Sequence, residues 1–178
     1  MQVPVVMTVI GADRPGIVEA VARVVAEHGG NWLESRMCRL GGQFAGILRA
    51  QVPPDRRPAL CDALKAMAAS GLTIVVEEDE AAPPAPPSGL AVIELVGQDR
   101  PGIVREISAA LARQRINVEE LTTEVVSAPM SGEPLFKARA TVTAPADADL
   151  APLRRELEKI AADLQVDIAI HPKTATPG

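Results

Sequence analysis

GADRPGIV, at residues 11–18, returns as GQDRPGIV at residues 97–104, with seven of the eight positions identical. The spacing is 86 residues, and Asn31 and Asn117 stand at that same spacing from each other. A sequence that repeats at a fixed distance is typical of a duplicated structural unit. The chain is therefore predicted to hold two copies of one domain.

A charged, proline-rich segment separates the two copies. It reads EEDEAAPPAPPS at residues 77–88, and proline-rich chains form extended, semi-stiff spacers. We predict a first domain at residues 1–78, a linker at 79–88 and a second domain at 89–178. The second copy is six residues longer, and the extra residues fall in a turn-forming stretch at 127–134.

The spacing of apolar residues gives both copies the same order of elements. Residues 3–10 and 90–96 are β-branched, apolar runs that predict strands. In each copy a helix follows, then two strands that begin at the asparagine and at Phe44 or Phe136, then a second helix. Closing strands are predicted at residues 73–76 and 166–170. The apolar stripes predicted for the four helices are Val18, Val21 and Val25; Leu60, Leu64 and Met67; Ile103, Ile107, Ala110 and Leu111; and Leu150, Leu153, Leu157, Ile160, Ala161 and Leu164.

The order βαββαβ, written twice, predicts an α+β fold made of two ferredoxin-like domains in tandem. Each domain has a four-stranded antiparallel sheet with two helices on one face. Two helices cover only one side of such a sheet. The other side is therefore expected to face solvent, a partner or the other repeat.

Composition excludes several classes of function. The chain has 18 Lys and Arg against 23 Asp and Glu, a net charge of −5, which argues against binding along a nucleic acid backbone. Aromatic residues make up 2% of the chain, too few for the base-stacking platforms of RNA-binding sheets. No apolar run approaches the length of a membrane span, and no secretory signal is visible, so we expect a cytoplasmic protein.

Isolated reactive residues give no catalytic or metal-binding pattern. Cys38 and Cys61 lack partners at ligand spacing and are predicted to be small buried hydrophobic residues. Trp32 is predicted to pack in the core or an interface. His28 is placed at a helix C-terminus, where partial positive charge is stabilising. We expect no enzyme activity, no metal and no cofactor.

The repeated octapeptide joins a strand to a helix and predicts a small anion-binding loop. Backbone N–H groups at a helix start lack partners and attract a carboxylate or a phosphate. We predict that Asp13 and Asp99 are the N-caps, that the prolines fall in the first helical turn, and that Gly16 and Gly102 permit close backbone approach. A good helix start alone explains one such loop, whereas two matching copies favour a role in binding.

Both halves resemble ACT domains, small regulatory modules that bind amino acids. The resemblance rests on the Asp-Arg-Pro-Gly-Ile-Val loop followed by an asparagine that opens the next strand, and it covers residues 3–78 and 89–171. It implies a ligand held at an interface between two domains. The candidate ligand-binding residues are Ala12, Asp13, Pro15, Gly16, Ile17, Asn31, Gln98, Asp99, Pro101, Gly102, Ile103 and Asn117.

The resemblance also implies a ligand chemistry. An aspartate in the loop suits the ammonium group of an amino acid, while the carboxylate then faces the N–H groups of Gly16 and Ile17, or of Gly102 and Ile103. A small pocket between glycine-rich backbones favours glycine or a serine-like ligand.

The resemblance finally implies a function: a non-catalytic amino-acid sensor that regulates transcription in glycine metabolism. Such a protein acts through a protein partner, such as a DNA-binding regulator, without binding nucleic acid or a membrane itself. Its ACT domains pair in a homodimer or within one chain. The alternative is a stand-alone interaction module of a metabolic enzyme, with no ligand of its own.

Overall fold

The computed structural model describes residues 2–79, 90–128, 132–144 and 150–172. The chain divides into two compact units, Met1–Ala82 and Pro83–Gly178, and each is described by itself. Of the predicted linker only Asp79 belongs to the described residues. Residues 129–131 of the longer turn in the second copy also lie outside them.

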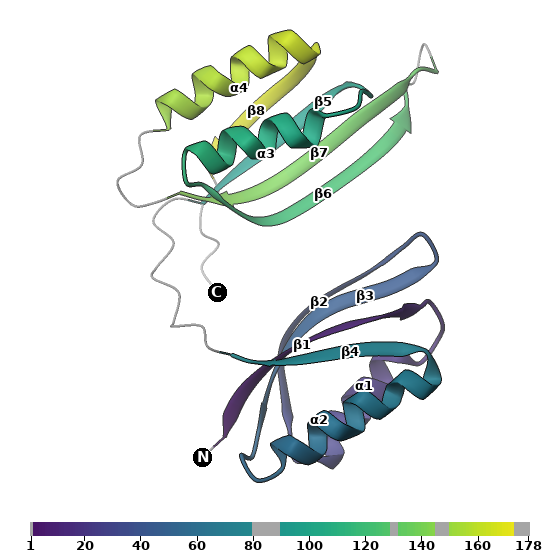
Figure 1. The fold of residues 1–178 in the computed structure, drawn as a ribbon. Helices are drawn as coiled ribbons and strands as arrows, with labels where there is room; N and C mark the ends of the chain where they lie inside the picture. The colour runs from purple at the N-terminus through teal and green to yellow at the C-terminus, as the bar shows by residue number, and fades with distance from the viewer. Residues whose placement is uncertain (1, 80–89, 129–131, 145–149, 173–178) are drawn as a thin grey trace. The chain divides into compact units, whose positions relative to one another are not determined.

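Both units have the predicted order βαββαβ, so the α+β, ferredoxin-like prediction is confirmed (Figure 1). The first unit consists of β1 (Val3–Ala12), α1 (Ile17–Glu27), β2 (Asn31–Leu40), β3 (Gln43–Val52), α2 (Arg57–Ala66), a short 3₁₀ helix (Met67–Ser70) and β4 (Leu72–Glu78). The second consists of β5 (Leu90–Gln98), α3 (Ile103–Arg113), β6 (Asn117–Ser127), β7 (Pro134–Thr143), α4 (Ala151–Leu164) and β8 (Val166–Pro172).

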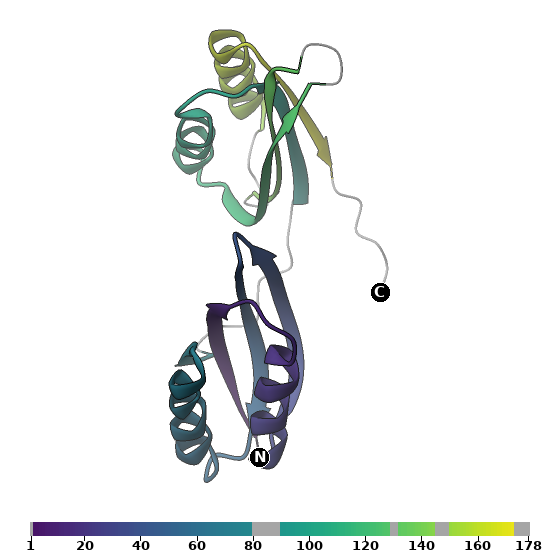
Figure 2. The same cartoon turned by 90° about the vertical axis from the view of Figure 1, so that its right-hand side faces the viewer.

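The first strand of each unit runs through the middle of its sheet. The strand order is β2-β3-β1-β4 in one sheet and β6-β7-β5-β8 in the other, and every pairing is antiparallel. Both helices of a unit lie on the same face of its sheet, which Figure 2 shows clearly for α3 and α4. The strands β2 and β6 are therefore edges, and both carry a bulge shortly after the opening asparagine.

The core of the first unit is one continuous cluster between the sheet and its two helices. Alternate residues of β1, namely Val5, Met7 and Val9, are fully buried because a strand points every second side chain to the same face. Leu60 and Leu64 of α2 are fully buried against them, four residues apart on one side of the helix. Burial of these apolar side chains is what stabilises the unit.

The second unit has a divided core. One cluster gathers around Ile93, Leu111 and Leu157, while Leu95 and Phe136 belong to another cluster nearer the end of β5. Ile107 of α3 and Ile168 of β8 are partly buried and pack against both clusters.

Three of the predicted helix stripes are partly wrong. Val18 is 46% exposed because it lies in the first turn of α1 on the side away from the sheet. Leu150 is 36% exposed because it precedes α4 as its N-cap. Met67 falls after the end of α2, in the short 3₁₀ helix, although it still packs against the core.

The predictions for the isolated cysteine, tryptophan and histidine residues are also partly right and partly wrong. Cys38 is exposed on the edge strand β2 and Cys61 is half-buried, so the prediction that both are buried is wrong. Trp32 packs against the first core, as predicted. His28 is the C-cap of α1, and its Nδ1 lies 2.8 Å from the carbonyl oxygen of Val24, so its predicted place at a helix C-terminus is confirmed.

Candidate functional site

The repeated loop has the same backbone in both units. Gly16 and Gly102 are the N-caps of α1 and α3, with left-handed φ angles of 88° and 97°. A side chain in that region is strained, so the positive φ explains why both positions are glycine. Among the residues that the structure describes, no atom apart from the glycine and its two chain neighbours lies within 4 Å of where a Cβ would stand on either residue. The space beside each N-cap is therefore open to a ligand.

The predicted capping scheme is wrong. The helices begin at Ile17 and Ile103, so Asp13 and Asp99 lie too early in the loop to be N-caps, and the prolines precede the first turn. The left-handed glycine delays the helix start by turning the chain just before it. Neither N-cap makes a side-chain hydrogen bond to the helix.

Without a side-chain cap, the first N–H groups of α1 and α3 stay available. The first bonds within the helices run from the N–H of Ala20 to the oxygen of Gly16, at 2.9 Å, and from the N–H of Glu106 to the oxygen of Gly102, at 3.0 Å. The N–H groups of the preceding helical residues have no acceptor among the residues that the structure describes. They therefore form a place for a small anion at the positive end of each helix.

The two aspartates are anchored alike through the backbone. The N–H of Asp13 donates to the oxygen of Gly42 at 2.9 Å, and the N–H of Asp99 donates to the oxygen of Pro134 at 3.1 Å. Gly42 lies in the turn between β2 and β3, and Pro134 is the first residue of β7. Each loop is thus held close to the end of its own sheet.

The carboxylates of the two aspartates differ. Asp13 forms an ion pair with Arg39 of β2, 2.6 Å from Oδ2 to Nε. Arg39 pairs in register with Phe44, and the residue that pairs with Phe136 in the second sheet is Val125. In the described parts of the chain, the Asp99 carboxylate has no ion pair or hydrogen bond. Asp99 is thus the aspartate that offers an unneutralised charge to an ammonium group.

We expect the ion pair at Asp13 to contribute little to stability. The Arg39 side chain is 70% exposed, and exposed pairs are worth less than about 1 kcal/mol because solvent screens them. Arg39→Ala should lower the free energy of unfolding of the first unit by no more than that, measured by urea denaturation. A loss near 3 kcal/mol would contradict this assignment of the pair.

The arginine of the motif was not among the predicted site residues, and the structure gives it a role in bracing the loop. Arg14 donates from Nη2 to the carbonyl oxygen of Ser70, 2.9 Å away, just before β4. Arg100 donates to the side-chain oxygen of Gln98 at 3.0 Å, and to that of Gln165, just before β8. Each arginine thus ties its loop to the turn that precedes the last strand. The only sign of this role in the sequence was that both copies of the motif have an arginine at this position.

The strand-opening asparagines lie far from the loops of their own units. Asn31 stands in register with Gln51 and, through it, with Pro4, whereas the loop leaves β1 after Ala12. Along β1, Pro4 and Ala12 are eight residues apart, which is about 26 Å at the usual rise of a strand. Asn117 is placed likewise, level with Leu90 at the start of β5. One unit therefore does not bring its loop and its asparagine together.

The two asparagines also differ in their contacts. The side chain of Asn117 donates to Oε1 of Glu119 at 2.8 Å, and Thr143 donates to the same oxygen. Glu119 stands at the bulge of β6, where the first unit has Leu33 in place of an acceptor. Both asparagines are exposed.

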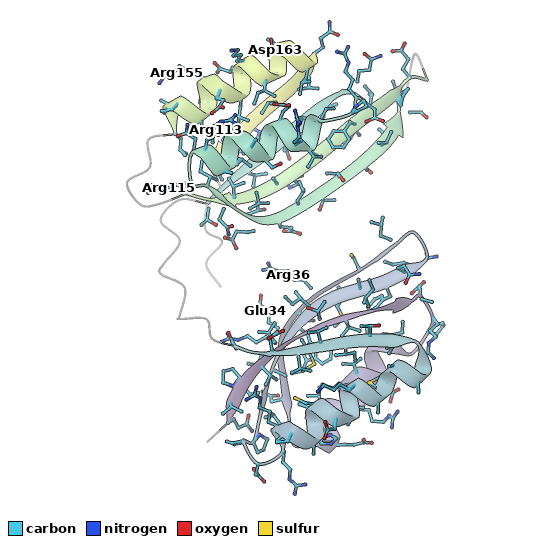
Figure 3. All side chains as sticks on the ribbon, viewed as in Figure 1. Glu34, Arg36, Arg113, Arg115, Arg155 and Asp163 are labelled. Carbon is cyan, nitrogen blue, oxygen red and sulfur yellow. The ribbon has the colours of Figure 1, made fainter. Side chains whose placement is uncertain are left out.

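The described residues contain neither a cluster of three His, Cys, Asp or Glu side chains able to hold a metal ion, nor a helix with the length and apolar character of a membrane span. Figure 3 shows the charged side chains spread over the surface, with Arg113 of α3 beside α4, where it binds Glu156 at 2.8 Å.

Comparison with known proteins finds one family model twice. The model described as ACT domain matches residues 4–77 and 90–171. The glycine cleavage system transcriptional repressor of Escherichia coli K12 is 26% identical over 167 residues, which cover 93% of this chain and 88% of the repressor. A UPF0237 protein of Methanopyrus kandleri is 36% identical over 81 residues, 45% of this chain and 83% of its own. A crystal structure of an unknown protein from Galdieria sulphuraria has a TM-score of 0.87 at 28% identity, covering 98% of this chain and all of that one.

Proposed function

The chain belongs to the ACT domain family, whose model matches both of its halves, and from that premise we propose that it is a non-catalytic regulatory protein that senses a small amino acid. The observation that carries the proposal is the duplicated loop, with uncapped N–H groups at the start of α1 and α3 and open space beside the N-cap glycine. Such a loop suits the carboxylate of an amino acid.

The ligand is glycine or a serine-like amino acid that lies between two domains. Its carboxylate accepts from the N–H groups at a helix start, and its ammonium group pairs with an aspartate, for which Asp99 is the better suited. Because a loop and its own asparagine lie at opposite ends of one sheet, the asparagine must come from another domain of this kind. The pairing takes place in a homodimer or within one chain.

The regulated process is transcription in glycine metabolism, by analogy with the repressor that covers most of this chain. We propose that the protein acts in the cytoplasm through a protein partner such as a DNA-binding regulator. The net charge of −5 supports a protein partner over direct contact with a nucleic acid. The amino acid favours the paired arrangement of the domains, and the partner responds to the population of that arrangement.

Titration calorimetry with glycine and serine tests the proposed sensing function. A proline at the second position of α1 or α3 tests the anion cradle, by which we mean the free N–H groups at the start of that helix. Val18→Pro and Val104→Pro each delete one N–H at an exposed position. The protein already has Pro58 and Pro152 at that position of α2 and α4, so the helices should still form. Each variant should weaken binding at its own loop about tenfold, because a hydrogen bond to a charged group is lost.

The matched controls are Val18→Ala and Val104→Ala, which shorten the same exposed side chains and keep the N–H. They should bind as the parent does. Unchanged affinity in both proline variants would contradict the proposed cradle. Absence of binding by any amino acid at millimolar concentration would contradict the sensor itself.

A second function, as an interaction module without a ligand, is supported by the helix-free face of the first sheet. Ile47 and Val75 flank Thr8 on neighbouring strands, and Ile10 is the next residue of β1 on that face. The three apolar side chains are 45–51% exposed. Arg36, in register with Ile47, projects on the same side as Glu34, away from α1 and α2 (Figure 3). Apolar residues beside charged ones are typical of a protein-binding surface.

A further inference from the structure

The edge strand β6 is exposed to solvent along almost its whole length. Ten of its eleven residues are exposed, and only Val126 is half-buried. Within the described residues it pairs with β7 on one side and with no strand on the other (Figure 1). Its outer edge therefore offers a row of backbone N–H and C=O groups to an incoming strand.

The face of β6 on the side of the helices carries exposed apolar residues. Leu121 and Val125 pair in register with Ala140 and Phe136 of β7, which belong to the two core clusters, so they project on the side of the helices. They are nevertheless 50% and 55% exposed. Large apolar side chains along an open strand edge are unusual in a protein that has no partner there.

The other face of β6 is acidic. Glu120 and Glu124 project on the helix-free side, in register with Thr141 and Lys137 of β7. Neither glutamate has an ion pair or a side-chain hydrogen bond within the described parts of the chain. The strand also contains Glu119 at its bulge, and it has no lysine or arginine. Beyond the bulge, β6 therefore presents one apolar face and one acidic face.

We propose that β6 binds an extended segment of a partner protein as an added strand, and that this segment alternates apolar residues with Lys or Arg. In this mode of recognition, backbone hydrogen bonds give affinity and alternate side chains give specificity. The apolar side chains of the segment cover Leu121 and Val125, and its cations pair across the strands with Glu120 and Glu124. The inference rests on the proposed function only in taking the regulated partner to be a protein.

A second copy of the chain matches β6 less well than such a segment does. Two β6 edges would bring glutamates together, and like charges that face each other across strands are destabilising. The strand β2 carries Arg36 on its helix-free face but also Arg39 on the helix side, where β6 is apolar. The strand β4 ends in Glu77 and Glu78, and β8 has neither lysine nor arginine. No edge strand in the described residues therefore alternates apolar and cationic residues.

The test uses the whole chain and the fluorescently labelled peptide acetyl-Lys-Val-Lys-Val-Lys-Val-Lys-amide. Fluorescence anisotropy should show saturable binding that weakens as salt is added, because the ion pairs lie at the surface. The same peptide with Glu in place of Lys should not bind. Hydrogen exchange followed by NMR should show amides at residues 121–127 that gain protection on binding, while those of β2 stay unchanged. Absence of binding, or binding without that protection, overturns the inference.

Charge reversal on the acidic face gives a matched pair of variants. Glu120→Lys should weaken binding of the lysine peptide about fivefold, because an opposite-charge pair becomes a like-charge pair. Glu34→Lys is the control, since Glu34 follows the bulge of β2 as Glu120 follows that of β6, and both are exposed. The control should leave the affinity unchanged. Equal effects of the two changes would show that the peptide responds only to net charge, which overturns the inference.

The outcomes separate this inference from the proposed function. Titration with glycine tests the sensor on the same samples, and Glu120→Lys should keep the parent's affinity for glycine. If no amino acid binds while the peptide protects β6, the sensor function fails and the inference stands. If glycine binds while the peptide does not, the inference alone fails. Protection of β6 in the free chain that is lost on dilution would show that a second copy occupies the edge, which also overturns the inference.

Discussion

Gly97→Ala is expected to destabilise the second unit by about 3 kcal/mol, among the largest effects of a single added methyl group in this protein. A Cβ on Gly97 would lie 2.7 Å from the Cα of Val166, its partner on β8, and closer still to the side chain of Val166. Backbone atoms cannot turn away as a flexible side chain does, so β5 and β8 would have to separate. Urea denaturation followed by circular dichroism measures the loss.

Gly102→Ala, five residues further on, is the matched control for Gly97→Ala. Its φ of 97° strains an alanine, but the space beside it is open, so we expect a loss of only about 1 kcal/mol. Equal losses in the two variants would contradict the expected collision between β5 and β8 at Gly97. Gly11→Ala provides a repeat in the first unit, where a Cβ would lie 2.6 Å from the oxygen of Gly71.

Leu64→Ala should lower the stability of the first unit by about 3 kcal/mol and leave the second unit unchanged. Leu64 is fully buried in the first core, so the shorter side chain loses apolar burial and leaves a cavity. The two units have separate cores, and their unfolding should therefore be resolved as two transitions. Differential scanning calorimetry shows both transitions in one experiment.

The control for Leu64→Ala is Lys65→Ala, one residue along and on the exposed side of α2. A surface change of this kind is usually worth less than about 0.5 kcal/mol. A joint shift of both transitions in Leu64→Ala would contradict the independence of the two cores.

The sequence predicted the elements well because their signals are local. Alternation in β1 and helical spacing at Val21 and Val25 are set by neighbours a few residues away, and the structure buries those residues as predicted. The repeat strengthened each assignment, since both copies had to satisfy the same order. Val18 and Leu150 were placed wrongly because the ends of helices carry the weakest periodic signal.

The site was harder to predict because it depends on backbone angles and on contacts between distant residues. Asp-Arg-Pro-Gly is typical of a capped helix start, and the amino-acid sequence does not indicate that Gly16 takes a left-handed φ. The pair between Asp13 and Arg39 follows from the register of three strands, which the sequence does not fix. The separation of Asn31 from the loop was accessible, since βαββ topology starts the second strand at the opposite end from the loop.

The bulged edge strands bear on how the protein avoids uncontrolled self-association. An open strand edge is a template on which foreign strands grow into fibrils, and natural proteins oppose this with charge and with kinks. On β6 the residues Glu119, Glu120 and Glu124 repel a second copy of the same edge, and the bulge near Glu119 interrupts the flat ladder that growth would need. Neutralising these glutamates should therefore make the protein prone to aggregation before it changes its fold.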